Sequence, residues 1–315
     1  MLDTCSSPSV GPAARLDAHH LGALATATLI AEAELTPKPA LVDQRGRGAH
    51  TDLDLALMVR SACALQPSFV AMARAATGAR PSQHLRERLA LLGREAETTM
   101  LTVTAGANAH RGAIWALGLL VAAAAITGPG APTHLAGTAG AIARFPDRAA
   151  PPSPSPSHGS AARARYGVTG ARGEACAGFP HVLEHGLPAL RAARARGLDS
   201  THARLDALLT LMAHLDDTCL LHRGGLLALH AAQRGARAVL DAGGTSTDAG
   251  LAALHQLDTH LLSLNASPGG AADVLAATLF LDALDPHAHD ELPLDPPADA
   301  RRPAPQESHH GTARL

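Results

Sequence analysis

The sequence predicts an all-α protein: a single orthogonal bundle of about ten helices, in which loop-to-helix junctions form the candidate site. Apolar residues recur at helical spacing, as Leu85, Leu89 and Leu92 do at i, i+4 and i+7. No segment alternates polar residues with Val, Ile and aromatic residues in the way that strands do. Because aromatic residues make up only 2% of the chain, the core has to consist of Leu, Ala and Val.

The expected helices follow one another along most of the chain. The apolar residues at 205, 208, 209 and 212 repeat the helical spacing, and the leucines from 254 to 264 continue it. The stretch "TDLD" at 51–54 has the capping-box pattern, with Thr51 as the N-cap. In chain order, helices are expected at about 14–33, 52–65, 68–77, 82–104, 110–127, 133–144, 180–196, 201–214, 222–240, 247–264 and 270–284.

The domain is expected to cover residues 14–284, with a flexible N-terminus at 1–13. The stretch "APPSPSPSHGSAARA" places a Pro/Ser-rich surface loop at about 146–162. Residues 285–315 contain too few apolar side chains to fold and are expected to form a disordered tail. The segments "AHRGAIWALGLL" at 109–120 and "LHRGGLLALHAA" at 221–232 are weakly similar. The similarity has two explanations, an internal duplication or chance.

Charge and composition exclude several classes of protein. A formal net charge of -2 and a pI near 6.8 argue against a nucleic-acid or membrane-surface footprint. Four cysteines without Cys-x-x-Cys spacing indicate neither a zinc site nor a disulfide framework. The longest apolar run, 113–127, is too short to span a bilayer, and no secretory signal precedes the first helix. We therefore expect a soluble, cytoplasmic protein.

One residue stands out because the composition disfavours it. Lys38 is the only lysine in the chain, whereas the other 25 basic residues are arginine. Pro37 and Pro39 flank it and restrict the backbone on both sides. An ammonium group is a compact point charge that fits where a guanidinium fork does not. The pattern predicts a phosphate ligand, and the alternative is a solvent-exposed lysine in a turn.

Charged and amide side chains gather at five loop-to-helix junctions: 34–54, 106–112, 172–184, 214–225 and 265–273. A helix N-terminus offers free N–H groups and the positive end of the dipole, and neighbouring glycines let backbone approach an anion. Such junctions suit a large polyanionic ligand, although an N-cap would equally explain Asn108. The predicted ligand-binding residues are Lys38, Arg45, His50, Asn108, His110, Arg111, His222, Arg223, Ser267, Gly269 and Gly270.

Several carboxylates at these junctions are candidates for metal binding or catalysis. Asp216 and Asp217 are adjacent, so they repel unless solvation, separation or a cation such as Mg²⁺ relieves them. A solvated helix end is the alternative for this pair. The candidate catalytic carboxylates are Glu34, Asp43, Asp52 and Glu174. For Asp52, a simple interaction with the helix dipole remains open.

Five motifs together resemble the triphosphoribosyl-dephospho-CoA synthase family. They are "ELTPKPALVDQRGRGAHTDLD", "GANAHRGAIWALGLL", "YGVTGARGEACAGFP", "DDTCLLHRGG" and "NASPGGAADVLAATLFL". They occur in the family's order and cover most of residues 30–282. The chain departs from the family pattern at Ala40, Ala109, Cys176 and Cys219, where glycine, threonine, an acidic residue and asparagine are usual. No role is therefore expected of those four side chains.

The resemblance implies an all-α enzyme that joins ATP to 3′-dephospho-CoA and releases adenine. The product would carry a triphosphoribosyl group on the ribose 2′-hydroxyl and pass to a holo-carrier-protein synthase. The carrier would belong to malonate decarboxylase or citrate lyase, and we favour the former. In that reaction Lys38, Arg111 and Arg223 would hold the triphosphate, with Mg²⁺ on one or both of Asp216 and Asp217.

The same resemblance suggests roles for the remaining candidates. His50, His110 and His222 would donate to phosphate or protonate adenine. The base, or the group that stabilises the sugar cation, would come from Glu34, Asp43, Asp52 or Glu174.

Two other functions stay open. A Mg²⁺-dependent hydrolase of N-ribosyl or nucleotide substrates would use water in place of the 2′-hydroxyl. A non-catalytic helical adaptor would bind dephospho-CoA without turnover. The sequence is also compatible with a homodimer.

Overall fold

The computed structural model describes residues 17–150, 158–286 and 292–294. Within these ranges the chain forms twelve α-helices and one π-helical turn, and the β-type pairing consists of an isolated bridge between Asp43 and Gly46. The predicted all-α fold is confirmed. The expectations for residues 1–13 and 151–157, and for most of the tail at 285–315, concern residues outside the described ranges.

The elements follow in this order: α1 (Ala18–Glu34), α2 (Leu55–Ala76), α3 (Gln83–Val103), α4 (Arg111–Thr127), α5 (Pro132–Ala143), α6 (His158–Tyr166), α7 (Gly170–Cys176), the π-helical turn η1 (Val182–Gly186), α8 (Leu187–Ala195), α9 (Ser200–His214), α10 (Thr218–Asp241), α11 (Asp248–Ser263) and α12 (Gly269–Ala283).

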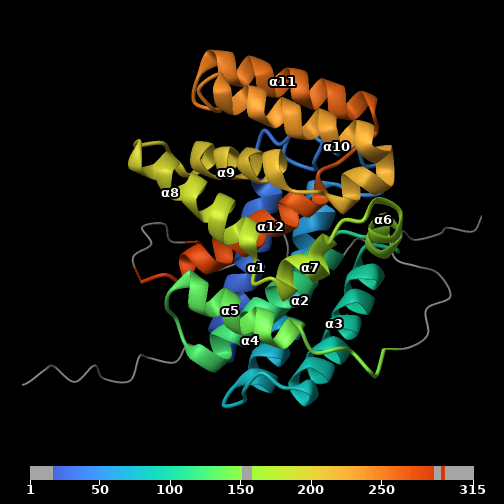
Figure 1. Cartoon of the computed structure of the whole chain (residues 1–315), viewed down its shortest axis with the longest axis vertical. Helices are drawn as coiled ribbons and strands as arrows, with labels where there is room; N and C mark the ends of the chain where they lie inside the picture. Colours follow the sequence, from blue (N-terminus) through green and yellow to red (C-terminus); the bar gives the residue numbers. More distant parts are fainter. Residues whose placement is uncertain (1–16, 151–157, 287–291, 295–315) are drawn as a thin grey trace, which may run out of the picture.

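Three helices, α1, α4 and α12, form the centre of the molecule and contact one another (Figure 1). α4 is buried all round, since every residue from 116 to 125 is buried. Such a helix belongs in a core rather than on a surface. α2, α3 and α5 pack on α4, whereas α8, α9 and α10 pack near α12, and α11 covers α10 as an outer layer. The chain turns by 112° between α4 and α5, in keeping with an orthogonal bundle.

The core is built from small and aliphatic side chains, as the composition requires. Phe69, Phe179 and Phe280 are fully buried, and Leu and Ala make up most of the rest. By length and composition alone α2 is apolar enough to cross a membrane, but in this fold it packs against α1, α3 and α4.

The second helix differs from the prediction at its start and in its middle. Helices expected at 52–65 and 68–77 are one continuous helix, α2, with Pro67 inside it. A proline removes one hydrogen bond and strains the helix, but here it faces solvent while packing on three helices holds both halves in line. The expected N-cap was also wrong. Asp54 is the N-cap, and its side chain accepts the N–H of Leu57 at 2.9 Å.

Other boundaries differ in the second half of the chain. The segment expected to be a loop up to residue 162 becomes helical at His158, and neither α6 nor the short α7 was predicted. The single helix expected at 180–196 is the π-helical turn followed by α8. α10 begins at Thr218 rather than at 222, and Gly225, with φ of 63° and ψ of -157°, interrupts it. Only glycine adopts that backbone conformation without strain.

Candidate active site

The loop between α1 and α2 is held in one conformation by the Asp43 carboxylate. One of its oxygens accepts the N–H of Lys38 at 2.8 Å and the Arg45 Nε at 2.9 Å. Arg45 also donates to Asp258 of α11 at 3.0 Å, and Asp258 accepts the N–H of Ala40 at 2.7 Å. Asp43 and Arg45, predicted as catalytic and ligand-binding, thus make contacts that fix the loop against α11. Their predicted roles stay predictions.

Lys38 points into the protein and not toward solvent. Its Nζ donates to the Glu32 side chain and to the Glu32 backbone carbonyl, both at 2.6 Å. Lys38 is 1% exposed and Glu32 is 4% exposed. Glu32 was missed by sequence reasoning, which chose the half-buried Glu34 at the end of the same helix. A buried cation beside an acid is paired first of all with that acid, so any contact of Lys38 with phosphate requires the ligand to reach this interior.

His110 belongs to the same interior. Its Nδ1 lies 3.1 Å from the Ser61 hydroxyl, and its Nε2 is buried without a hydrogen-bond partner among the described residues. Burial, and then the positive charge of Lys38, lower the pKa of His110 to about 4. At neutral pH this imidazole is uncharged, so it is not a cationic phosphate ligand in this structure.

We expect the protein to lose stability as the pH falls from about 6.5 to about 4. In the unfolded chain His110 binds a proton near pH 6.5, whereas in the folded chain it does so only near pH 4. Between these values the unfolded state binds more protons, so acid favours unfolding by on the order of a few kcal/mol. Urea midpoints at pH 7, 6 and 5 measure this loss. A His110→Gln variant should show a shallower pH dependence, and parallel curves for the two proteins would contradict the assignment.

His50, Arg223 and Ser267 meet at the edge of this interior. The Arg223 guanidinium donates to the Ala49 carbonyl at 2.9 Å and lies 3.2 Å from the His50 Nδ1. The His50 Nε2 lies 3.0 Å from the Ser267 hydroxyl. Burial and Arg223 lower the pKa of His50 to about 4, against the opposing effect of Asp52, which lies 3.8 Å away. These contacts join three distant segments, each from one of the loop-to-helix junctions that the sequence singles out.

Asp217 links two helix N-termini. One oxygen accepts the N–H groups of Cys219 and Leu220 at the start of α10, and the other accepts that of Ala271 in α12 at 2.9 Å. A Cβ on Gly270 would lie 2.8 Å from this carboxylate. The N-terminus of α12, expected to bind a phosphate near Gly269 and Gly270, therefore already holds an anion of the protein itself.

This arrangement bears on the predicted Mg²⁺ ligands. Both Asp217 oxygens point at N–H donors, which leaves them poorly placed for a cation, and Asp217 is 2% exposed. Asp216 is exposed and free of such contacts. Among the described residues no group of three or more His, Cys, Asp or Glu side chains could hold a metal ion. Of the predicted pair, Asp216 is exposed and Asp217 is engaged by backbone N–H groups, and the metal role of both stays a prediction.

Glu174 lies in a second cluster. Its carboxylate accepts the backbone N–H of His181 at 2.8 Å and faces the His181 Nδ1 at 2.7 Å, and this contact raises the pKa of His181. The rings of His185 and His214 stack nearby, with centroids 4.0 Å apart. The negative charge of Asp216 also contributes to the raised pKa of His181, so this cluster lies near the segment that contains Asp216 and Asp217. His181 was not identified from the sequence.

The remaining predicted residues lie nearer the surface. The Asn108 side chain is exposed and accepts the N–H of Arg111 at 3.2 Å, the capping geometry that was the alternative reading. Arg111 forms an ion pair with Glu97 at 3.1 Å. His222 is exposed on α10, one residue before Arg223.

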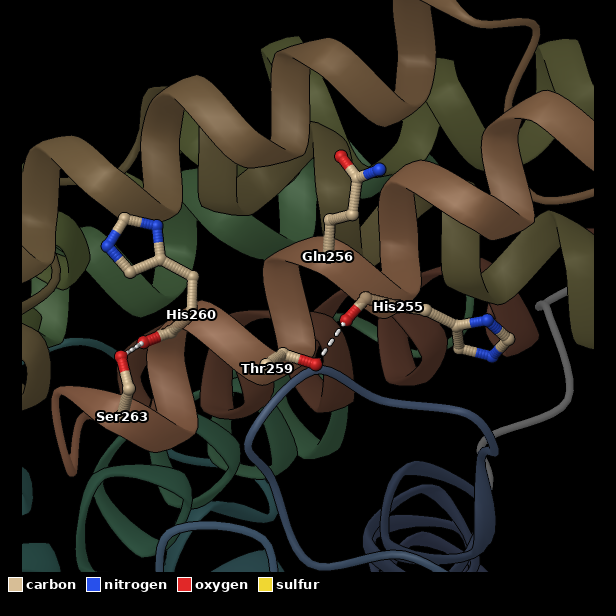
Figure 2. Close-up of a pocket in the computed structure, with 5 residues that line it drawn as sticks. All are labelled: His255, Gln256, Thr259, His260 and Ser263. Carbon is tan, nitrogen blue, oxygen red and sulfur yellow. Dashed lines mark hydrogen bonds between the residues drawn. The ribbon is translucent and has the colours of Figure 1, made fainter.

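A hollow on α11 is lined by a different set of residues. Figure 2 shows its lining, which consists of His255, Gln256, Thr259, His260 and Ser263. Thr259 and Ser263 use their hydroxyls on backbone carbonyls of their own helix, at 2.9 Å and 2.7 Å. None of the predicted site residues lines this hollow, so we place the candidate site in the interior between α1, α4, α10 and α12.

Comparisons with known proteins agree with a nucleotide-dependent transferase. The family model described as ATP:dephospho-CoA triphosphoribosyl transferase matches residues 18–291. The chain belongs to this family and is an enzyme of its class.

Two curated relatives, each named "Probable 2-(5''-triphosphoribosyl)-3'-dephosphocoenzyme-A synthase", illustrate the similarity. The one from Azotobacter vinelandii is 60% identical over 265 residues, covering 84% of this chain and 90% of the relative. The one from Stutzerimonas stutzeri is 57% identical over 272 residues, covering 86% of this chain and 93% of the relative. No solved structure matches the chain.

Proposed function

We propose that the chain transfers the 5-triphosphoribosyl group of ATP to the ribose 2′-hydroxyl of 3′-dephospho-CoA, with release of adenine. The structural observation that supports this is the enclosed group of acids and bases between α1, α4, α10 and α12. Lys38 acts electrostatically on His110, Glu32 on Asp273, and Asp217, Asp273 and Arg223 all act on the Cys219 thiol. These side chains come from opposite ends of the sequence, and each lies close enough to act on the charge of another.

The chemistry requires such a group. The attack falls on the ribose carbon C1, so the triphosphate has to be held without being cleaved. Departure of adenine builds positive charge on the sugar, which a nearby carboxylate stabilises. Arg223, with His50 and Ser267 beside it, offers donors for the phosphates at the edge of the interior. A Mg²⁺ ion would neutralise triphosphate charge, and the exposed Asp216 is the carboxylate that we propose contacts it.

The direct test incubates the purified protein with ATP, Mg²⁺ and 3′-dephospho-CoA. We expect adenine and a triphosphoribosyl-dephospho-CoA in equal amounts, measured by chromatography and mass spectrometry. ADP or AMP in place of adenine would overturn the proposal. Adenine release without dephospho-CoA would identify the hydrolase, and binding of dephospho-CoA without turnover would identify the adaptor.

We further propose that the product serves the acyl carrier protein of malonate decarboxylase, in the cytoplasm, after transfer by a holo-carrier-protein synthase. The support is the general similarity of the sequence motifs. The test mixes the product and the holo-carrier-protein synthase with the carrier protein of malonate decarboxylase or with that of citrate lyase. The carrier that is loaded faster identifies the pathway. Preferential loading of the citrate lyase carrier would overturn this choice.

A further inference from the structure

The Asp273 side chain combines burial with an unusually close approach to a neighbouring helix. It lies in the first turns of α12, which crosses the centre of the molecule (Figure 1). Its carboxylate rests over Gly112 at the beginning of α4, where the neighbouring backbone N–H of Ala113 opposes the rise of its pKa. A Cβ on Gly112 would lie 2.9 Å from the Asp273 Cγ, so only glycine leaves room for the carboxylate there. The side chain is half-buried.

No cation among the described residues forms an ion pair with Asp273. The nearby ammonium of Lys38 is engaged by Glu32, and the Arg223 guanidinium bonds to Ala49 and His50. The negative groups around Asp273 are Glu32 from α1 and Asp217 at the start of α10, while His110 at the start of α4 is uncharged at neutral pH. Burial and these two carboxylates raise the pKa of Asp273 well above its ordinary value.

Asp217 and Glu32 differ from Asp273 in what they already bind. Asp217 is saturated by backbone N–H groups of α10 and α12, and Glu32 by Lys38. The Asp273 carboxyl faces Gly112 and Ala113 at the beginning of α4, and among the described residues no ion pair or side-chain hydrogen bond engages it. It is therefore the carboxyl of this interior that can exchange a proton with a substrate.

We propose that Asp273 is the catalytic acid that protonates the departing adenine. This inference rests on the proposed function and names a residue of that same site. As the bond between C1 of the ribose and N9 of adenine breaks, the Asp273 proton moves to a ring nitrogen of adenine. The 2′-hydroxyl oxygen of dephospho-CoA then bonds to C1, and its proton passes to the Asp273 carboxylate. The net change moves one proton from the hydroxyl to adenine and restores the acid.

The first test is Asp273→Asn. General acid catalysis is worth about 10²- to 10⁴-fold in rate, so we expect kcat to fall by that factor while KM for ATP changes little. The variant should unfold at about the same urea concentration as wild type, because the amide is neutral and close in size to the protonated carboxyl that it replaces. Loss of activity without loss of stability separates catalysis from folding. A kcat within about threefold of wild type would overturn the proposal.

A second measurement uses ATP methylated at N7 of adenine, whose base leaves without needing a proton. With this analogue, corrected for its spontaneous breakdown, the deficit of Asp273→Asn should shrink at least tenfold. An equal deficit with ATP and the analogue would show that Asp273 acts only structurally. Gly112→Ala, which displaces the carboxylate but keeps it, should lose kcat with ATP in the same way.

The matched control is Asp241→Asn, an exposed aspartate at the end of α10, which should leave kcat and stability unchanged. The activity of the wild-type protein distinguishes failure of the proposed function from failure of the proposed role of Asp273. If wild type releases no adenine in the presence of dephospho-CoA, the proposed function fails and this inference with it. If wild type is active and Asp273→Asn is equally active, the inference alone fails.

Discussion

Replacing Lys38 by methionine is expected to lower the free energy of unfolding by about 3–5 kcal/mol. Without the ammonium, the Glu32 carboxylate remains buried with no counter-charge, and removal of one partner of a buried ion pair has a cost of this size. The change should appear as a lower urea midpoint at pH 7 and as a loss of adenine release. A midpoint equal to that of wild type would show that the pair contributes nothing to the fold.

The matched control is the double variant Glu32→Gln with Lys38→Met. It removes both charges, so most of the lost stability should return, although activity should not. Lys38→Arg tests the shape of the site separately. Arginine would have to place a broad guanidinium where the Lys38 Nζ makes two hydrogen bonds at 2.6 Å. We therefore expect the Lys38→Arg variant to be less stable than wild type as well.

This ion pair gives a physical reason for the single lysine in an arginine-rich chain. The site is 1% exposed and surrounded by packed side chains, so it accepts a compact ammonium on a flexible stem. The alternative of a solvent-exposed lysine in a turn is wrong, because Lys38 is buried, and the phosphate contact stays a prediction. The partner of Lys38 could not be found from the sequence, because Glu32 lies inside α1 with no local pattern to distinguish it from Glu34.

The fold was predictable because most helices have apolar residues at helical spacing and are long enough for that spacing to be evident. α6 and α7 were missed because they are short, at 9 and 7 residues, and depend on contacts with α10, α5 and α4 rather than on a periodic pattern. Pro67 was misleading for the opposite reason, since packing maintains a helix that local chemistry disfavours.

The candidate site was predictable only in part. Contacts of His50 with Arg223 and Ser267 agree with the hypothesis that the loop-to-helix junctions come together, and each of the three lies within two residues of a glycine or proline. The contacts that decide the roles of other residues join segments far apart in the chain. Ala271 binds Asp217 across 54 residues, and Ala40 binds Asp258 across 218 residues. Such pairings follow from how the helices pack, and no local signal encodes them.

Substitution of Asp217 is expected to have the second large effect on stability. It distinguishes a carboxylate that joins two helices from one that binds a metal ion. Asp217→Asn should lower the free energy of unfolding by about 2–4 kcal/mol, because an amide can accept N–H groups on one side only and turns its own NH₂ toward donors on the other. The measurement is the urea midpoint, together with kcat across a range of Mg²⁺ concentrations. Excess Mg²⁺ should not restore activity if the carboxylate joins α10 to α12.

The adjacent Asp216 is the control for that experiment, because it is exposed and makes none of these backbone contacts. Asp216→Asn should leave stability within about 0.5 kcal/mol of wild type, as exposed substitutions usually do. If this residue meets the ATP-bound metal, the variant should need more Mg²⁺ for half-maximal activity. In the opposite outcome, Asp217→Asn is as stable as wild type and regains activity at high Mg²⁺ concentration. Asp217 would then be the metal ligand, and another group would have to hold the N-terminus of α12.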